Sequence, residues 1–139
     1  MNLMVICTGN TCRSPMGEGI LRQLLRERSR EDVLVESAGL SAFEGDAPSE
    51  HAVEALEEIG IDISGHRSRR PSPAELSAAS RIYVMTAAHR RSLELLQPEL
   101  SDRIRVIGVE DPYGLSLSAY RKCREQLLDF FRGELEELL

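Results

Sequence analysis

Short apolar segments alternate with amphipathic segments along the whole chain. The residues Leu3-Met4-Val5-Ile6 form a continuous apolar run, which is typical of a strand covered on both faces of a parallel sheet. Further strands are predicted from Val33 to Ser37, from Arg81 to Met85, and from Arg103 to Val106 or Ile107. A helical pattern follows each of these strands after a polar loop or turn.

Capping residues, prolines and glycines mark the ends of the helices. The first helix, from Ser14 to Arg28, has Pro15 in its first turn, where the missing N–H costs nothing. The other helices are predicted from Pro48 to about Ile59 before Gly60, from the capping box of Ser72 and Glu75, from Thr86 to Gln97 before Pro98, and from about Ser116 onward.

This order of elements predicts an α/β fold, a three-layer sandwich with a four-stranded parallel sheet and helices on both faces. Residues 1–139 contain no repeat and no Gly/Ser linker, so we expect a single domain. Ligands of such sheets bind beyond the carboxyl ends of the strands. The loops after the first and the fourth strand are therefore the expected site.

Composition and charge exclude several classes of protein. The 17 basic and 23 acidic residues give a net charge of −6, so no nucleic acid is expected as a partner. No apolar run approaches the ~20 residues of a membrane span, and the first run is too short for a signal peptide. Three cysteines do not make a disulfide framework and suit a reducing compartment. We expect a soluble cytoplasmic protein with no membrane contact.

The loop after the first strand has the composition of an anion-binding cradle. It reads Cys7-Thr8-Gly9-Asn10-Thr11-Cys12-Arg13-Ser14, and all residues from Thr8 to Ser14 are predicted to bind phosphate. Gly9 lets successive N–H groups turn inward, and the helix end adds a positive dipole. These groups and Arg13 favour the thiolate of Cys7, which makes it a candidate nucleophile. The Arg13 guanidinium can hold two phosphate oxygens.

This loop, with the residues Pro15-Met16-Gly17-Glu18 after it, resembles the Cys-x5-Arg-Ser loop of the low-molecular-weight protein tyrosine phosphatases. The likeness covers nearly the whole chain and includes Ser37-Ala38-Gly39, His51 to Leu56, Gly60 to Ser64, His66-Arg67-Ser68 and Asp111-Pro112-Tyr113-Gly114. The resemblance implies that Cys7 attacks phosphorus, Arg13 stabilises the transition state and Asp111 is the general acid.

The loop after the fourth strand is also a competent β-turn, in which an aspartate is commonly a turn residue. Because this loop leaves the sheet at the same edge as Cys7, Asp111 can protonate the leaving atom there. Its carboxylate can later take a proton from water. Tyr113 and Phe43 are predicted to wall the pocket and select the substrate, with packing inside their own loops as the alternative.

Other residues are predicted to support the loop. Asn10 tolerates left-handed backbone and can bond its own loop, and Ser14 can donate its hydroxyl to the thiolate. The resemblance implies that His66 braces Asn10, whereas His51 and His89 are predicted to be ordinary helix-surface residues.

The family likeness also implies a redox role for Cys12, which would form a reversible disulfide with Cys7 and protect it from over-oxidation. A small buried thiol is the alternative interpretation. Cys123 fits the apolar stripe of the last helix and is predicted to be a core residue.

Thr11 separates two hypotheses about the substrate. Tyrosine-specific members of the family usually carry a branched aliphatic residue here, and a threonine looks like the protein arginine phosphatase branch. The hydroxyl offers a polar partner to a guanidinium, and Asp111 can pair with a positive leaving group. We favour phosphoarginine in proteins over phosphotyrosine, the alternative.

Functions of other classes fit less well. An arsenate reductase of this fold needs mid-chain cysteines, and none occurs between Cys12 and Cys123. A zinc site lacks a second ligand pair. A non-catalytic phosphocysteine carrier or binding module gains nothing from Arg13 and Asp111. We therefore expect a cofactor-free, metal-independent hydrolase of phosphorylated proteins; the pattern defines neither its target nor its oligomeric state.

Overall fold

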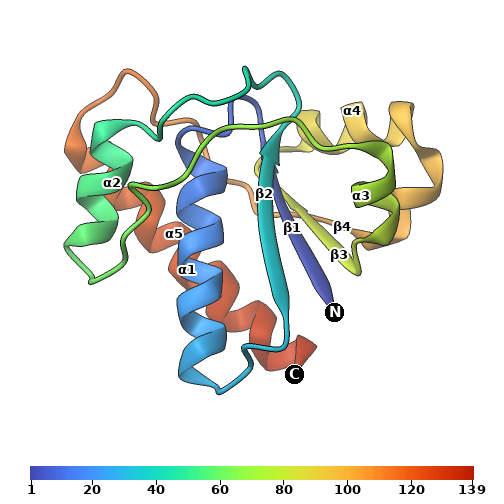
Figure 1. The fold of residues 1–139 in the computed structure, drawn as a ribbon, viewed down its shortest axis with the longest axis horizontal. Helices are drawn as coiled ribbons and strands as arrows, with labels where there is room; N and C mark the ends of the chain where they lie inside the picture. Colours follow the sequence, from blue (N-terminus) through green and yellow to red (C-terminus); the bar gives the residue numbers. More distant parts are fainter.

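The computed structural model describes all 139 residues and has a four-stranded sheet between two layers of helices (Figure 1). All strands are parallel and lie in the order β2-β1-β3-β4. The strands are β1 (Asn2–Cys7), β2 (Leu34–Gly39), β3 (Arg81–Val84) and β4 (Ile104–Val106). The predicted α/β sandwich is confirmed, and each strand ends within two residues of its predicted bounds.

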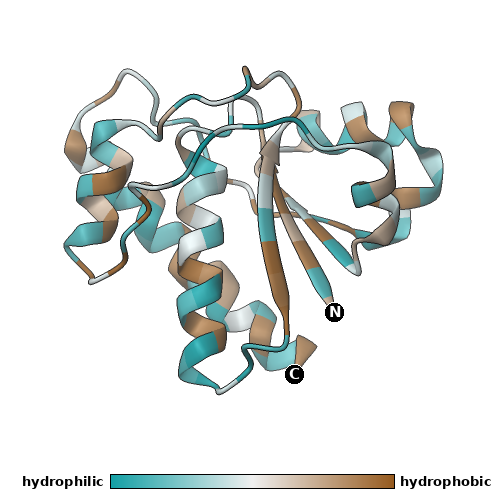
Figure 2. Cartoon of the chain, in the orientation of Figure 1, coloured by the Kyte–Doolittle hydropathy of each residue, from teal (hydrophilic) through white to brown (hydrophobic).

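Alternate side chains of β1 enter two separate cores. Leu3 and Val5 face a layer of three helices, and Met4 and Ile6 face the opposite layer. The first layer contains α1 (Arg13–Glu27), α2 (Glu50–Glu57) and α5 (Leu117–Leu138), and the second contains α3 (Pro73–Ala78) and α4 (Ala87–Leu96). Burial on both faces explains why the strand is apolar from Leu3 to Ile6, while the helices carry both teal and brown positions in Figure 2.

The ends of the helices follow the predicted capping chemistry, with one addition. Ser72 and Glu75 form a complete capping box at the start of α3, and Thr86 accepts a hydrogen bond from the backbone of α4. Gly60 has a φ of 80° just after α2. Pro98 follows the end of α4 as predicted, but it also begins a 3-10 helix, η1 (Pro98–Arg103), which the sequence pattern did not indicate.

The carboxyl ends of the strands bring distant loops together at one edge of the sheet, at the top of Figure 1. The backbone N–H of Leu40 donates to the carbonyl of Cys7, and that of Gly108 donates to the carbonyl of Met85. The first bond joins the segment after β2 to the end of β1, and the second joins the segments after β4 and β3. The loops after β1 and β4, where the ligand site was predicted, therefore lie at this edge. None of the helices is both long enough and apolar enough to cross a bilayer.

Candidate active site

Cys7 is the last residue of β1, and its side chain is buried beneath the loop that leads into α1. Its Sγ lies 2.8 Å from the Oγ of Ser14 and accepts a hydrogen bond of 3.3 Å from the backbone N–H of Asn10. The Asn10 amide also donates to the Ser14 Oγ at 2.8 Å. The Ser14 proton is therefore free to point at the sulfur, and two donors converge on this atom.

Asn10 is the centre of the network that holds this loop. It has a φ of 57°, a left-handed conformation that asparagine tolerates better than most residues. Its side-chain amide donates to Ser37 at 3.0 Å as well as to Ser14, and its Oδ1 accepts from the backbone of Arg69 at 3.0 Å. His66 Nε2 lies 2.9 Å from the Asn10 carbonyl oxygen, where the predicted brace requires it. The contact with Ser37 was not predicted from the sequence.

Gly39, at the end of β2, lies directly against the loop. A Cβ at this position would stand 2.5 Å from the Thr8 carbonyl oxygen and 2.8 Å from the Asn10 nitrogen. The neighbouring N–H of Ser41 donates to the same Thr8 carbonyl at 3.0 Å. Only glycine leaves room for this approach, which gives the Ser-Ala-Gly segment a steric role that its sequence alone did not reveal.

Arg13 joins the two predicted loops. Its side chain is only 5% exposed, and Nη1 donates to the carbonyl of Val109 at 3.0 Å. Nη2 lies 3.7 Å from Oδ2 of Asp111, whose side chain is 52% exposed. The cation from the first loop and the carboxylate from the second therefore meet beside Cys7, as their positions at one sheet edge predicted.

A pocket of about 270 Å³ opens over Cys7. Its lining contains the predicted residues Thr11, Phe43 and Tyr113, and the two aromatic side chains are 76% and 70% exposed at its rim. The remaining lining residues are Thr8, Gly9, Cys12, Arg13, Ser41, Asp46 and Asp111. Asp46 was missed by the sequence analysis because nothing in its neighbourhood marks an exposed aspartate as part of a pocket.

Ser68 fixes the backbone that presents Asp46. The Ser68 hydroxyl accepts from the Asp46 N–H at 2.9 Å and donates to the carbonyl of Phe43, and the Ser68 N–H donates to the Asp46 carbonyl at 2.8 Å. Ser68 itself is buried. The wall that carries Phe43 and Asp46 is therefore anchored to the rest of the fold.

The three cysteines are free thiols, and each is buried. Cys12 Sγ lies 3.4 Å from the hydroxyls of both Ser49 and Tyr120. Burial, together with the hydrogen bond that the Tyr120 hydroxyl donates to Cys12, raises the pKa of Tyr120 to about 12. Cys123 lies in the core, where burial raises the pKa of its thiol to about 12.

His89 is not the surface residue that the sequence analysis predicted. It is buried, its Nε2 lies 2.8 Å from Thr8 Oγ1, and its Nδ1 lies 3.1 Å from Thr86 Oγ1. The prediction is wrong because the pattern along the helix does not show that Thr8 packs against the start of α4. His89 is in the first turn of α4, which begins at the same sheet edge as the Cys7 loop, and this position was the available signal. His51 is half-buried, with its ring against Tyr120.

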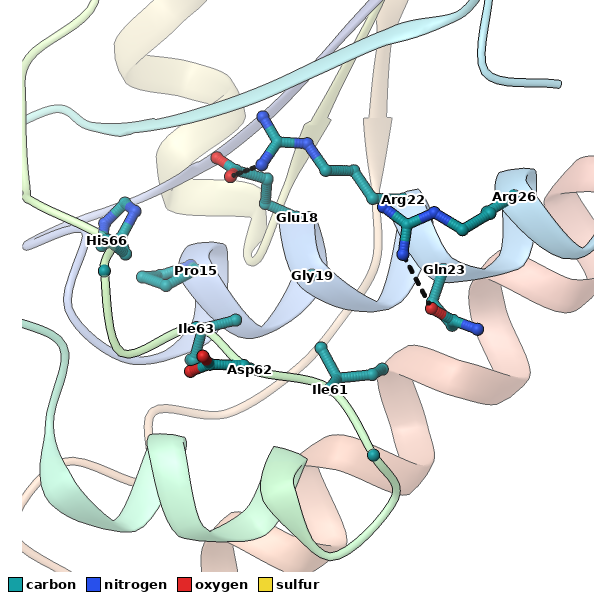
Figure 3. A pocket seen from close by; sticks show the side chains of 12 residues that line it. Pro15, Glu18, Gly19, Arg22, Gln23, Arg26, Ile61, Asp62, Ile63 and His66 are labelled. Atoms are coloured by element: carbon teal, nitrogen blue, oxygen red, sulfur yellow. Dashed lines mark hydrogen bonds and ion pairs between the residues drawn. The ribbon is translucent and has the colours of Figure 1, made fainter.

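A larger cavity of about 520 Å³ lies on the other side of α1 (Figure 3). It lies between that helix and the segment that carries Ile61, Ile63 and His66, and an ion pair of 2.8 Å between Glu18 and Arg22 lies at its wall. It contains neither Cys7 nor Asp111. The larger cavity therefore lies apart from the predicted catalytic residues.

Cys7 ends the first strand of this fold, hydrogen-bond donors surround it, and an arginine and a carboxylate lie beside it. This arrangement defines the class of cysteine-based phosphatases. The family described as low molecular weight phosphotyrosine protein phosphatase matches residues 2–138. The chain belongs to this family, and it is a protein phosphatase and hence a hydrolase.

Relatives in this family carry two kinds of name. A protein-arginine-phosphatase of Geobacillus stearothermophilus is 33% identical, over 90% of this chain and 87% of the relative. The low molecular weight protein tyrosine phosphatase of T. tengcongensis has a solved structure with a TM-score of 0.93 and 40% identity, covering 99% of both chains. The YwlE arginine phosphatase, solved as a cysteine-to-serine variant with a phosphorylated active site serine, has a TM-score of 0.93 and 30% identity, covering 99% of this chain and 95% of that one.

Proposed function

We propose that this protein hydrolyses phosphoarginine in proteins through a phosphocysteine intermediate on Cys7. The observation that carries the proposal is the lining of the pocket, in which Thr11 lies with two carboxylates, Asp46 and Asp111. A guanidinium is planar and positively charged, so it pairs with the carboxylate of Asp46 in a way that a phenol ring does not. Asp111 is protonated before the reaction and becomes a carboxylate that can pair with the departing guanidinium.

In the first step, the Cys7 thiolate attacks phosphorus and the bond from phosphorus to the guanidinium nitrogen breaks. Asp111 gives its proton to the departing nitrogen, so the arginine leaves in a stable form. Arg13 and the N–H groups of the loop hold the phosphoryl oxygens, where they stabilise the charge of the transition state. Ser14 stabilises the thiolate through the contact of 2.8 Å.

In the second step, a water molecule attacks the phosphorus of phosphocysteine. The Asp111 carboxylate accepts a proton from this water, the bond from sulfur to phosphorus breaks, and inorganic phosphate leaves with Cys7 restored as a thiolate. The phosphorylated serine of the YwlE variant supports a covalent phosphoryl group at this place in the family. Asn10, supported by His66, keeps the loop in its binding shape throughout.

The same site supports two further parts of the proposal. Cys12 lies in the loop with Cys7, and as a free thiol it is available for a protective disulfide with Cys7 on oxidation. The three free thiols also support a reducing compartment, the cytoplasm, as the place of action.

Phosphotyrosine is the second candidate substrate. The exposed aromatic side chains of Phe43 and Tyr113 at the rim favour it, because they can stack on a phenol ring. An arginine side chain also stacks on aromatic faces, so these two residues favour neither substrate strongly. Thr11 and the carboxylates therefore support phosphoarginine as the first candidate.

The deciding experiment is a measurement of kcat/KM on matched peptides that carry phosphoarginine or phosphotyrosine. We expect the wild-type protein to prefer phosphoarginine and Thr11→Ile to move the ratio of the two values towards phosphotyrosine. Thr11→Val is the matched control, since it removes the hydroxyl without adding length. Cys7→Ser should abolish turnover of both peptides. A ratio that Thr11→Ile leaves unchanged contradicts the proposed selectivity, and turnover by Cys7→Ser contradicts the mechanism.

A further inference from the structure

A chain of hydrogen bonds crosses from α4 to the loop over Cys7. It begins at Thr86, whose Oγ1 accepts from the backbone N–H of His89 at 3.4 Å. It continues from Thr86 Oγ1 to Nδ1 of the His89 ring at 3.1 Å and from Nε2 of the ring to Thr8 Oγ1 at 2.8 Å. Thr8 is exposed and lines the substrate pocket, so these hydrogen bonds lead from the half-buried Thr86 through the buried His89 to the place where substrate binds.

The donors and acceptors in this row of hydrogen bonds fit one arrangement of protons well. The Thr86 oxygen already accepts from the helix backbone, so its single proton is available for Nδ1 of His89. The ring proton of a neutral histidine then lies on Nε2 and is donated to Thr8. The Thr8 oxygen acts as an acceptor in this bond, and its own proton is left without a protein partner.

The surroundings of His89 favour this neutral ring. Burial and the positive charge of Arg13 lower the pKa of His89, and the carboxylate of Asp111 opposes them less strongly. The ring is therefore uncharged at neutral pH, with one nitrogen that accepts and one that donates.

We infer that Thr8 donates its hydroxyl proton to a phosphoryl oxygen in the pocket and that His89 is the positioning residue that turns this hydroxyl towards the substrate. The inference rests on the proposed attack by Cys7, but it does not depend on which phosphorylated amino acid the protein prefers. It adds a side-chain donor to the backbone N–H groups and to Arg13, on the side of the pocket that faces α4.

The first test removes or keeps the Thr8 hydroxyl. Thr8→Val is nearly the same size but has no hydroxyl, and Thr8→Ser keeps it. With p-nitrophenyl phosphate as a general substrate, we expect Thr8→Val to lower kcat/KM by about three- to tenfold, the size of one hydrogen bond, and Thr8→Ser to stay within about twofold of wild type. Inhibition by orthovanadate, which resembles the transition state, should weaken by the same factor in Thr8→Val only.

The second test asks whether His89 acts through Thr8. His89→Met fills the space without a donor, whereas the amide of His89→Gln can still donate to Thr8. We expect His89→Met to lower kcat/KM by about three- to tenfold in the wild-type background, but to add nothing in the Thr8→Val background. His89→Gln should restore most of the activity. Thermal unfolding of each variant verifies that the protein is folded.

Two results overturn the inference. The first is a Thr8→Val variant with the kcat/KM and vanadate inhibition of wild type, and the second is a loss in His89→Met that persists in full after Thr8 has lost its hydroxyl. If His89→Met does not fold, the comparison of Thr8→Val with Thr8→Ser decides the role of the hydroxyl, and His89→Gln decides the positioning. Cys7→Ser distinguishes failure of this inference from failure of the proposed function. If Cys7→Ser is inactive and Thr8→Val has the kcat/KM of wild type, only the role of the Thr8 hydroxyl is rejected and the attack by Cys7 still stands.

Discussion

The guanidinium of Arg13 lies 3.7 Å from the carboxylate of Asp111 and, through its other terminal nitrogen, donates to the carbonyl of Val109 at 3.0 Å. Arg13 comes from the loop after β1, and its two partners come from the loop after β4. One buried side chain thus positions the proposed acid relative to the proposed nucleophile. The Asp111 carboxyl group is half exposed, so it can leave Arg13 when a phosphoryl group binds there without a large change in its own solvation.

Replacement of Asp111 by asparagine should separate the two chemical steps. On phosphoarginine we expect kcat to fall by about 10² to 10⁴, because the leaving nitrogen needs a proton. The p-nitrophenolate group leaves without a proton, so with p-nitrophenyl phosphate the second step should become limiting and phosphocysteine should accumulate. A burst of p-nitrophenol and a mass increase by one phosphoryl group measure this.

Glu110→Gln is the matched control for this variant, since it removes the same charge from the adjacent residue, which does not line the pocket. It should retain wild-type kinetics. A variant Asp111→Asn with full activity on phosphoarginine and no burst would remove Asp111 from the reaction.

Replacement of Asp46 by asparagine should change substrate preference but leave the chemistry intact. Asp46 is an exposed carboxylate at the pocket, so we expect a modest loss of kcat/KM, about two- to fivefold, on phosphoarginine peptides and none on phosphotyrosine peptides. The loss should shrink at high salt. Asp102→Asn, an equally exposed substitution in η1, is the control. An equal effect on both peptides would argue against recognition of a guanidinium by Asp46.

Replacement of Gly39 by alanine should distort the loop from Cys7 to Ser14, which is proposed to bind phosphate. The new Cβ would stand 2.5 Å from the Thr8 carbonyl oxygen, so the loop or β2 must shift. We expect a loss of about 1–3 kcal/mol in the free energy of unfolding, measured with urea, and weaker binding of inorganic phosphate. Gly133→Ala in α5 meets no atom within 4 Å and should stabilise the protein by up to about 1 kcal/mol. Unchanged phosphate binding in Gly39→Ala would show that the loop tolerates the added methyl group.

The pH dependence of stability should carry the signature of His89. The pKa of His89 is lower in the folded protein than the ordinary 6.5 because of burial and Arg13, so the unfolded chain binds more protons just below that pH. Stability is therefore fully present above about pH 6.5 and falls as the pH drops below it, by at most about 1.4 kcal/mol per pH unit for one proton. His89→Gln removes this contribution, so urea unfolding from pH 7 to pH 5 should give a shallower fall. Parallel curves for the two proteins would contradict the assignment.

Much of the fold and of the reactive centre could be predicted from the sequence because their signals are local. The run from Leu3 to Ile6 identifies a strand buried on both faces, and Ser72 with Glu75 identifies a helix start. The placement of Cys7 and Arg13 follows from a loop between a strand and a helix. Parallel topology then brings Asp111 to the same edge, although it is more than a hundred residues away.

What could not be predicted depends on contacts between segments that are distant in the sequence. Ser37 is a polar residue in a strand, and only the register of β2 beside β1 places it against Asn10. Asp46 enters the pocket because Ser68 holds its backbone, and His89 is buried because α4 begins beside the phosphate loop. In each case a tertiary contact outweighs the local pattern.

The many partners of Asn10 have a consequence for how such enzymes diversify. The loop's curvature is completed during folding, by groups from β2, from the segment of His66 and Arg69, and from the loop itself. The loop is therefore preorganised, and no part of the binding free energy of a substrate is needed to shape it. We therefore expect substitutions at Thr11 and at the rim of the pocket to exchange one phosphorylated side chain for another while Asn10 and its partners stay the same, which is consistent with the shared architecture of the arginine and tyrosine phosphatases.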